Sequence, residues 1–105
     1  MPNIEANKGI ITQINVFTVK PGQQQALVNL LIESANFVKD VSGWISASIH
    51  VSLDGRQVVN YAQSESHEAS QEIIEKLRRG GYLDRNKLLA DARPSLYEVV
   101  YTLEK

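Results

Sequence analysis

The sequence contains no cysteine, which excludes disulfide bonds, thiolate nucleophiles and cysteine-based zinc sites. Histidine is also scarce: His50 and His67 lie far apart in the sequence, without clustered carboxylates. That spacing predicts no metal site. A nucleophile elbow and a glycine-rich phosphate loop are missing as well. Any chemistry must therefore come from a less conspicuous set of side chains.

The chain has little excess charge of either sign, since 11 Lys and Arg residues against 12 Asp and Glu residues give a net charge of −1. We expect no nucleic-acid partner, because phosphates require a basic surface. No hydrophobic run reaches membrane-spanning length, and residues 1–9 lack the apolar segment of a signal peptide. We therefore expect a cytoplasmic protein with no membrane partner and a single domain over residues 1–105, flexible over 1–9.

Hydrophobic periodicity divides the chain into strands and helices, separated by Pro21-Gly22, Ser42-Gly43 and Gly80-Gly81. Ser66 is a suitable N-cap for the second helix. In chain order we expect a strand at 10–20, a helix at 23–40, strands at 44–53 and 57–63, helices at 67–79 and 85–91, and a strand at 96–103. This order predicts a ferredoxin-like β-α-β-β-α-β fold of the α+β class, with one antiparallel sheet.

The predicted strands carry apolar residues on both faces of the sheet, but the helices cover one face. An uncovered apolar face is too large for a soluble monomer. A second copy packed sheet to sheet is the simplest cover, so we expect a homodimer.

The predicted hairpin over residues 44–66 carries the polar side chains that face a ligand or solvent. Ser46, Ser48 and His50 share one face of its first strand, and Asn60 lies on the second strand. A two-residue turn at 54–55 places His50 and Asn60 on opposite faces of the sheet. A three-residue loop with Gly55 in the left-handed region places them on one face. We favour the second arrangement because it gathers the polar groups, facing the helices.

The stretches INVFTVKPG, GWISASIHVSLDG and VVNYAQSES, with LYEVVY near the end, resemble the antibiotic biosynthesis monooxygenase family over residues 10–104. The resemblance implies a homodimeric α+β barrel. It also implies an oxidoreductase that oxidises a small aromatic phenol or quinol with molecular oxygen and needs no metal, flavin, haem or other cofactor. The alternative is a non-catalytic dimeric small-molecule binder or stress-related protein on the same barrel.

The resemblance assigns catalytic positions. In quinone-forming members, a His on the strand before the turn and the Asn of an NYAQWES motif line the cavity; these match His50 and Asn60. His50 would be the general base and Asn60 the donor to a developing oxyanion. A Tyr on the helix that follows the motif is Ser70 here. The motif's Trp is Ser64, which enlarges the pocket and supports the binder alternative.

The substrate-binding candidates are the aromatic and small polar side chains of the hairpin and an arginine, matched by either Arg85 or Arg79. Trp44 either roofs an aromatic ligand or plugs the end of the core. The haem-degrading branch of the family matches less well, because Asn15 is displaced by one position. The full set of predicted site residues is His50 and Asn60 as catalytic groups, and Trp44, Ser46, Ser48, Ser64 and Arg85 as substrate-binding groups.

Overall fold

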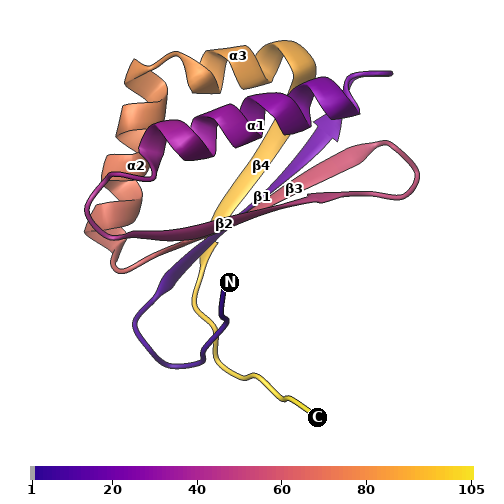
Figure 1. Ribbon diagram of the computed structural model, residues 1–105. Helices are drawn as coiled ribbons and strands as arrows, with labels where there is room; N and C mark the ends of the chain where they lie inside the picture. Colours follow the sequence, from indigo (N-terminus) through magenta and orange to yellow (C-terminus); the bar gives the residue numbers. More distant parts are fainter. Residues whose placement is uncertain (1) are drawn as a thin grey trace.

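The computed structural model describes residues 2–105 and consists of one antiparallel sheet with its helices on one face (Figure 1). The sheet order is β2-β3-β1-β4. The predicted ferredoxin-like α+β fold is confirmed. Its elements are β1 (Ile11–Val19), α1 (Gln24–Val38), β2 (Trp44–Val51), β3 (Gln57–Ser64), α2 (His67–Arg79), α3 (Tyr82–Leu89) and β4 (Ala90–Tyr97).

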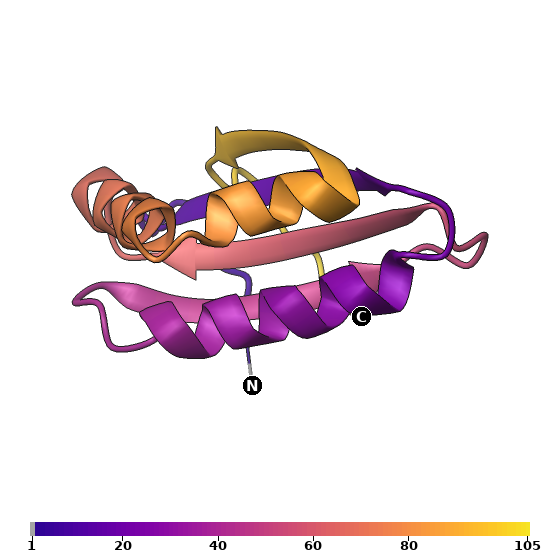
Figure 2. The same ribbon diagram turned by 90° about the horizontal axis from the view of Figure 1, so that it is seen from above.

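The sheet has two distinct faces. Seen from above, α1, α2 and α3 lie over the strands (Figure 2), and we call the face beneath them the helix face. Both chain ends lie on the other side, which we call the open face (Figure 1). Phe17 is opposite Val58 and Asn15 is opposite Asn60 on the helix face, whereas Ile14 is opposite Tyr61 on the open face.

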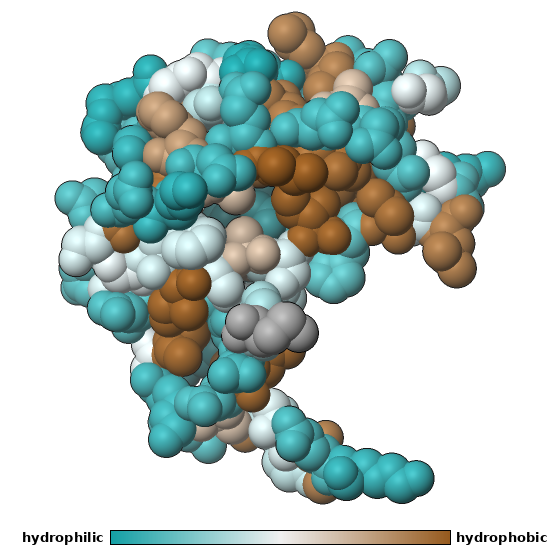
Figure 3. All heavy atoms as spheres, in the orientation of Figure 1, coloured by the Kyte–Doolittle hydropathy of each residue, from teal (hydrophilic) through white to brown (hydrophobic). Residues whose placement is uncertain are grey.

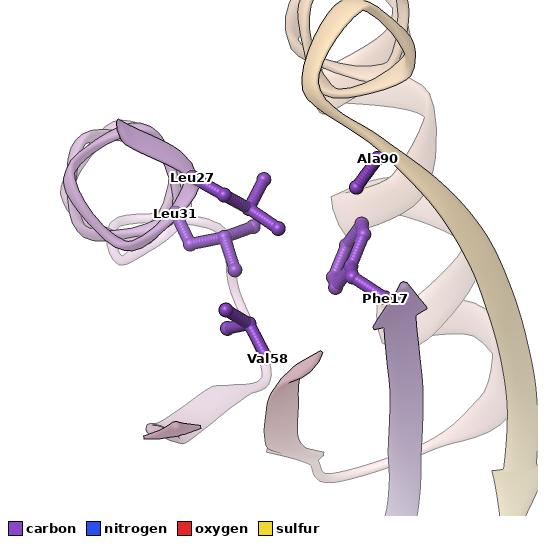
Figure 4. Close-up of a cluster of buried hydrophobic side chains, with 5 residues drawn as sticks. All are labelled: Phe17, Leu27, Leu31, Val58 and Ala90. Atoms are coloured by element: carbon purple, nitrogen blue, oxygen red, sulfur yellow. The ribbon is translucent and has the colours of Figure 1, made fainter. Parts of the chain in front are cut away.

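A compact apolar cluster fixes α1 to the sheet. Leu27 and Leu31 of α1 point toward Phe17 of β1, Val58 of β3 and Ala90 at the start of β4 (Figure 4). All five are almost fully buried, and each large apolar side chain contributes about 1.5–3 kcal/mol by leaving water.

Two small residues, Ser66 and Gly43, determine how α2 begins and how closely it packs against the start of β2. The Ser66 Oγ accepts a hydrogen bond from the Ala69 amide at 3.0 Å, which confirms the predicted N-cap. Gly43, at φ +91°, lies so close to this helix that a Cβ there would be 2.5 Å from the Ala69 Cβ. The Gly43 carbonyl also accepts a hydrogen bond from the Glu65 amide. The chain thus brings α2 close against the start of β2.

The predicted final strand at 96–103 is wrong: β4 occupies Ala90–Tyr97. It pairs with β1 from Val19 opposite Ala90 to Thr12 opposite Tyr97. Pro94, read from the sequence as a boundary, is tolerated inside this strand because β4 is an edge strand and needs no amide on its outer side. The preceding helix consequently spans Tyr82–Leu89, not 85–91.

The last residues, 98–105, continue beyond the sheet as an extended segment (Figure 1). The Asn7 amide donates a hydrogen bond to the Val99 carbonyl, which ties this segment to the N-terminal residues. Val100, Tyr101 and Leu103 are at least 73% exposed. Their strand-like apolar pattern therefore has no cover within the described protomer.

The hairpin register contradicts the prediction that His50 and Asn60 share a face. His50 is opposite Val59, and Asn60 is opposite Ile49, so the two side chains lie on opposite faces. A two-residue turn at 54–55 would give the same strand pairing. In the structure the strands separate earlier, so the loop spans residues 53–56. Gly55 has the predicted positive φ, +78°.

Side-chain hydrogen bonds explain the wider loop. The Asp54 carboxylate accepts from the Ser52 hydroxyl at 2.7 Å and from the Arg56 amide at 3.0 Å. The Gln57 amide donates to the same Ser52 hydroxyl. These contacts hold the carboxylate charged and lower the pKa of Asp54, with the Ser52 bond the largest cause.

Among residues 2–105, the helices are too short or too polar to cross a lipid bilayer.

Candidate active site

A cavity of about 370 Å³ lies between the helix layer and the helix face of the sheet. A smaller extension, of about 40 Å³, continues toward Trp44 at the start of β2. Both parts are lined by Gln13, Leu31, Ser34, Asn60, Ile74 and Leu77, so we treat them as one cavity.

The floor of the cavity is rich in side-chain amides. Asn60 on β3 and Asn15 on β1 are direct cross-strand neighbours, and Asn86 reaches the cavity from α3. The Oδ1 atoms of all three are buried and have no hydrogen-bond partner among residues 2–105. Because an unpaired buried amide oxygen is costly, three in one cavity mark it as a place for a polar ligand.

The walls of the cavity are apolar. Leu31 of α1, Ile74 and Leu77 of α2 and Leu83 of α3 close it from above, while Ala62 contributes a small floor residue. Such walls bury the rings of an aromatic ligand and leave orientation to a few polar groups.

The charged residues that line the cavity are both cationic. Arg78 of α2 and Lys87 of α3 are exposed side chains at its edge. Arg78 also pairs with Glu75 on the same helix. No histidine, aspartate or glutamate of the described residues lines either part of the cavity. The cavity therefore favours a neutral or anionic ligand over a cation.

Two predicted site residues lie in the cavity beside Asn60. Trp44 lines the smaller part of the cavity. Ser64 is 4% exposed and lines the same part. Its Oγ donates to the Ser66 carbonyl at 3.4 Å. Ser70 lies there too.

The other hairpin candidates lie on the open face. Ser48 is opposite Tyr61 and His50 is opposite Val59, and both partners are on the open face. The His50 side chain is exposed. The Ser46 hydroxyl donates to the side-chain Oε1 of Gln63 at 2.8 Å, next to an irregularity of the β2 register. The prediction of one polar pocket combining these residues with Asn60 is wrong, because the observed register turns the two strands' polar sets apart.

Arg85 lies outside the cavity, over the outer side of α1 and α3. Its guanidinium donates to the Glu33 carboxylate at 2.9 Å and lies 5.2 Å from the centre of the Tyr82 ring. The Tyr82 hydroxyl donates to the same carboxylate at 2.8 Å. The Tyr82 bond, followed by the Arg85 bond, lowers the pKa of Glu33. The alternative, Arg79, lines neither part of the cavity.

Several cavity residues were missed from the sequence. Gln13 and Asn15 had a readable signal, because their polar side chains interrupt the apolar face that includes Phe17. Asn86 and Arg78 had none. Their positions depend on the corner between α2 and α3, where Gly81 adopts φ +81°.

Comparison with known proteins places the chain in a family. The tetracenomycin-F1 monooxygenase of Streptomyces glaucescens is 30% identical over 103 residues, which cover 97% of this chain and 92% of that protein. No protein-family model matches the sequence.

Solved structures agree with this relationship. A monooxygenase from the gene ActVA-Orf6 of Streptomyces coelicolor, in complex with nanaomycin D, is 26% identical with a TM-score of 0.79 over 93% of this chain and 94% of that one. SnoaB, a cofactor-independent oxygenase from Streptomyces nogalater, has the same fold: its TM-score is 0.82 at 19% identity, over 92% of this chain and 99% of that one. The chain belongs to the antibiotic biosynthesis monooxygenase family.

Proposed function

We propose that this protein is a cofactor-independent monooxygenase that oxidises a phenol- or quinol-type aromatic molecule in the cavity beneath its helices. The observation that carries the proposal is the position of the Asn60 side-chain amide, whose Oδ1 has no hydrogen-bond partner among residues 2–105, on an apolar-walled cavity of about 370 Å³. Family membership supports the reaction type. The nanaomycin D complex of the ActVA-Orf6 protein supports an aromatic ligand.

The reaction we propose is the conversion of a ring CH₂ group, as in an anthrone, into a carbonyl. The substrate loses a proton, and the resulting enolate transfers electrons to molecular oxygen. A carbon–oxygen bond forms to give a hydroperoxide, which loses water. One oxygen atom remains in the quinone and the other leaves as water, so CH₂ and O₂ become C=O and H₂O.

Asn60 has the role of stabilising the enolate oxygen. The Nδ2–H of Asn60, an amide donor on the strand floor of an apolar-walled cavity, favours the charge that develops in the transition state, and removing one such donor from an oxyanion hole costs about 10²–10³ in kcat. The positive charge of Lys87 acts in the same direction, because a nearby cation lowers the pKa of a bound acid.

His50 is not the base in this scheme, because it is exposed on the open face and the cavity is on the helix face. The substrate proton passes to water. The rate should then follow the ionisation of the bound substrate, without a further inflection near the ordinary histidine pKa of about 6.5.

We also propose that the protein is a homodimer joined through the open faces. Ile14, Val16, Val59 and Tyr61 are only half-buried there. Apolar side chains of the segment 98–105 are exposed as well. Figure 3 shows hydrophobic surface in separate patches and the chain end projecting from the body. A stable interface of this kind buries more than about 1,200 Å² in total, and sedimentation should give twice the chain mass.

The deciding experiment measures oxygen uptake by chelator-treated protein with anthrones, with ¹⁸O₂ labelling of the product. We expect one labelled oxygen per quinone and a loss of about 10²–10³ in kcat for Asn60→Ala. Asn36→Ala is the matched control: it removes an exposed α1 amide that donates to the Ile32 carbonyl. Equal turnover by wild type and Asn60→Ala would contradict the proposal.

His50→Ala separates the two assignments of the base. A general base predicts a loss of about 10²–10⁴-fold, whereas the position on the open face predicts none.

A binder without catalysis is the second candidate, favoured by Ser64 at the family's tryptophan position. It predicts saturable binding of anthraquinones and no oxygen uptake above the uncatalysed rate.

A further inference from the structure

The proposed reaction gives a role to one of the three unpartnered amides, which leaves Asn15 and Asn86 unexplained. We propose that these two residues determine specificity by recognising hydroxyl groups that flank the reacting position of the substrate. The substrate class is then a polyhydroxylated aromatic, not an unsubstituted one. This inference rests on the proposed function, and the experiment below separates the two.

The geometry places Asn15 next to the enolate-stabilising group. Asn15 and Asn60 face each other across the β1–β3 ladder on the helix face. Cross-strand neighbours have Cα atoms about 4.5–5.5 Å apart, so their side chains can reach two oxygens on the same ring system. A ring oxygen held by Asn60 therefore has its neighbouring substituent within reach of Asn15.

Asn86 belongs to the opposite side of the cavity. It is on α3 and is 8% exposed, although its neighbours Arg85 and Lys87 are exposed. A buried amide in a short exposed helix packs less well than leucine and needs partners. The described chain provides none for its Oδ1. Ligand hydroxyls approaching from the cavity would provide them.

The chemistry of the lining selects hydroxyl and keto oxygens. Each amide offers one acceptor and two donors, which suits a hydroxyl beside a carbonyl. Carboxylates, the usual partners of a cationic ligand, do not line the cavity among residues 2–105. The two lining cations, Arg78 and Lys87, would repel such a ligand. A site built to pair a hydroxyl discriminates strongly against the analogue without it, because its own polar groups are left unpaired.

The test compares two substrates and two variants. Oxygen uptake is measured with 1,8-dihydroxyanthrone and with unsubstituted anthrone, for wild type, Asn15→Val, Asn86→Leu and the control Asn36→Ala. We expect wild type and control to prefer the dihydroxy substrate. Each cavity variant should reduce the ratio of the two kcat/KM values roughly tenfold, mainly through KM for the dihydroxy substrate.

Binding provides a readout that does not depend on turnover. Trp44, the single tryptophan, lines the cavity, so quenching of its fluorescence reports the Kd of 1,8-dihydroxyanthraquinone and of anthraquinone. The same loss of preference is expected in both variants. If neither anthrone is oxidised but binding shows the preference, the proposed function fails and the recognition role stands.

Thermal unfolding excludes a purely structural role. Replacing an unpartnered buried amide by an apolar residue of similar size should leave Tm unchanged or raise it. A fall in Tm with an unchanged ratio of kcat/KM values would overturn the inference. So would equal binding of the two anthraquinones by wild type, the result expected if water satisfies the amides.

Discussion

Replacing Gly43 by alanine should be among the most damaging single-methyl changes in the protein. Gly43 has φ +91°, and an alanine Cβ there would stand 2.5 Å from the Ala69 Cβ of α2. The left-handed backbone costs an alanine about 1–2 kcal/mol. The overlap requires α2 to move, and overpacking of this kind typically costs about 1–3 kcal/mol. We expect a total loss of about 2–5 kcal/mol in the free energy of unfolding.

Gly22→Ala is the matched control. Gly22 has a similar φ, +77°, but nothing lies within 4 Å of the position that an alanine methyl would take. It should cost only the backbone part, about 1–2 kcal/mol. Urea unfolding of both variants, followed by circular dichroism at one protein concentration because a dimer's stability depends on it, gives the comparison. Equal destabilisation of the two variants would refute the steric argument.

A double-mutant cycle isolates the contact itself. Ala69→Gly removes the opposing methyl and costs about 1 kcal/mol in helix propensity. In that background Gly43→Ala should cost no more than Gly22→Ala, giving a coupling energy of about 1–3 kcal/mol. Because α2 also carries Ile74 and Leu77 of the cavity wall, displacement of this helix by Gly43→Ala should weaken ligand binding measured by Trp44 fluorescence.

Three further changes test other parts of the structure. Ser64→Trp should fill the smaller part of the cavity, raising anthrone oxidation and weakening binding of bulkier ligands; unchanged Kd values would show that residue 64 does not limit the cavity. Glu33→Gln should lower Tm at pH 7, because folding lowers the pKa of Glu33 and the charged carboxylate therefore stabilises the folded state. This stabilisation is present above the unfolded-state pKa and is lost as pH falls through the folded-state pKa. The Tm values of wild type and variant should therefore converge in acid. Deletion of residues 98–105 should weaken the dimer in sedimentation experiments, and an unaffected dimer would exclude this segment from the interface.

The element order was predictable because each boundary carries a local signal. Pro21-Gly22 ends β1, Ser66 caps α2 and Gly55 turns the hairpin, and each acts through backbone geometry that depends little on the rest of the chain. The final strand was not predictable in the same way. Pro94 normally indicates a boundary, and only the edge position of β4, a property of the assembled sheet, makes it acceptable inside a strand.

The site was harder to predict than the fold, because a shift of one residue in the strand pairing moves a side chain to the other face of the sheet. Asn60, Trp44 and Ser64, three of the predicted site residues, line the cavity. His50 was assigned to the wrong face, because the loop has one residue more than the predicted three, and the side chains of β2 from Ser46 to Val51 therefore lie on the opposite side relative to β3. Asn86 lies on a helix whose rotation is set by packing at the α2–α3 corner, which no local pattern encodes.

In the observed register, the two faces of the sheet carry different kinds of side chains. On the helix face, Asn15 and Asn60 stand between apolar walls and form a place for a ligand. On the open face, His50 and Tyr61 lie among half-buried apolar residues that a second copy would cover. A strand residue reaches only one face, so substitutions at these two pairs should separate cleanly. Changes at Asn15 or Asn60 should alter ligand binding without altering the sedimentation mass, and changes at Tyr61 should do the reverse. A Tyr61 variant that remained a dimer but lost ligand affinity would show that the two faces are coupled through the strand itself.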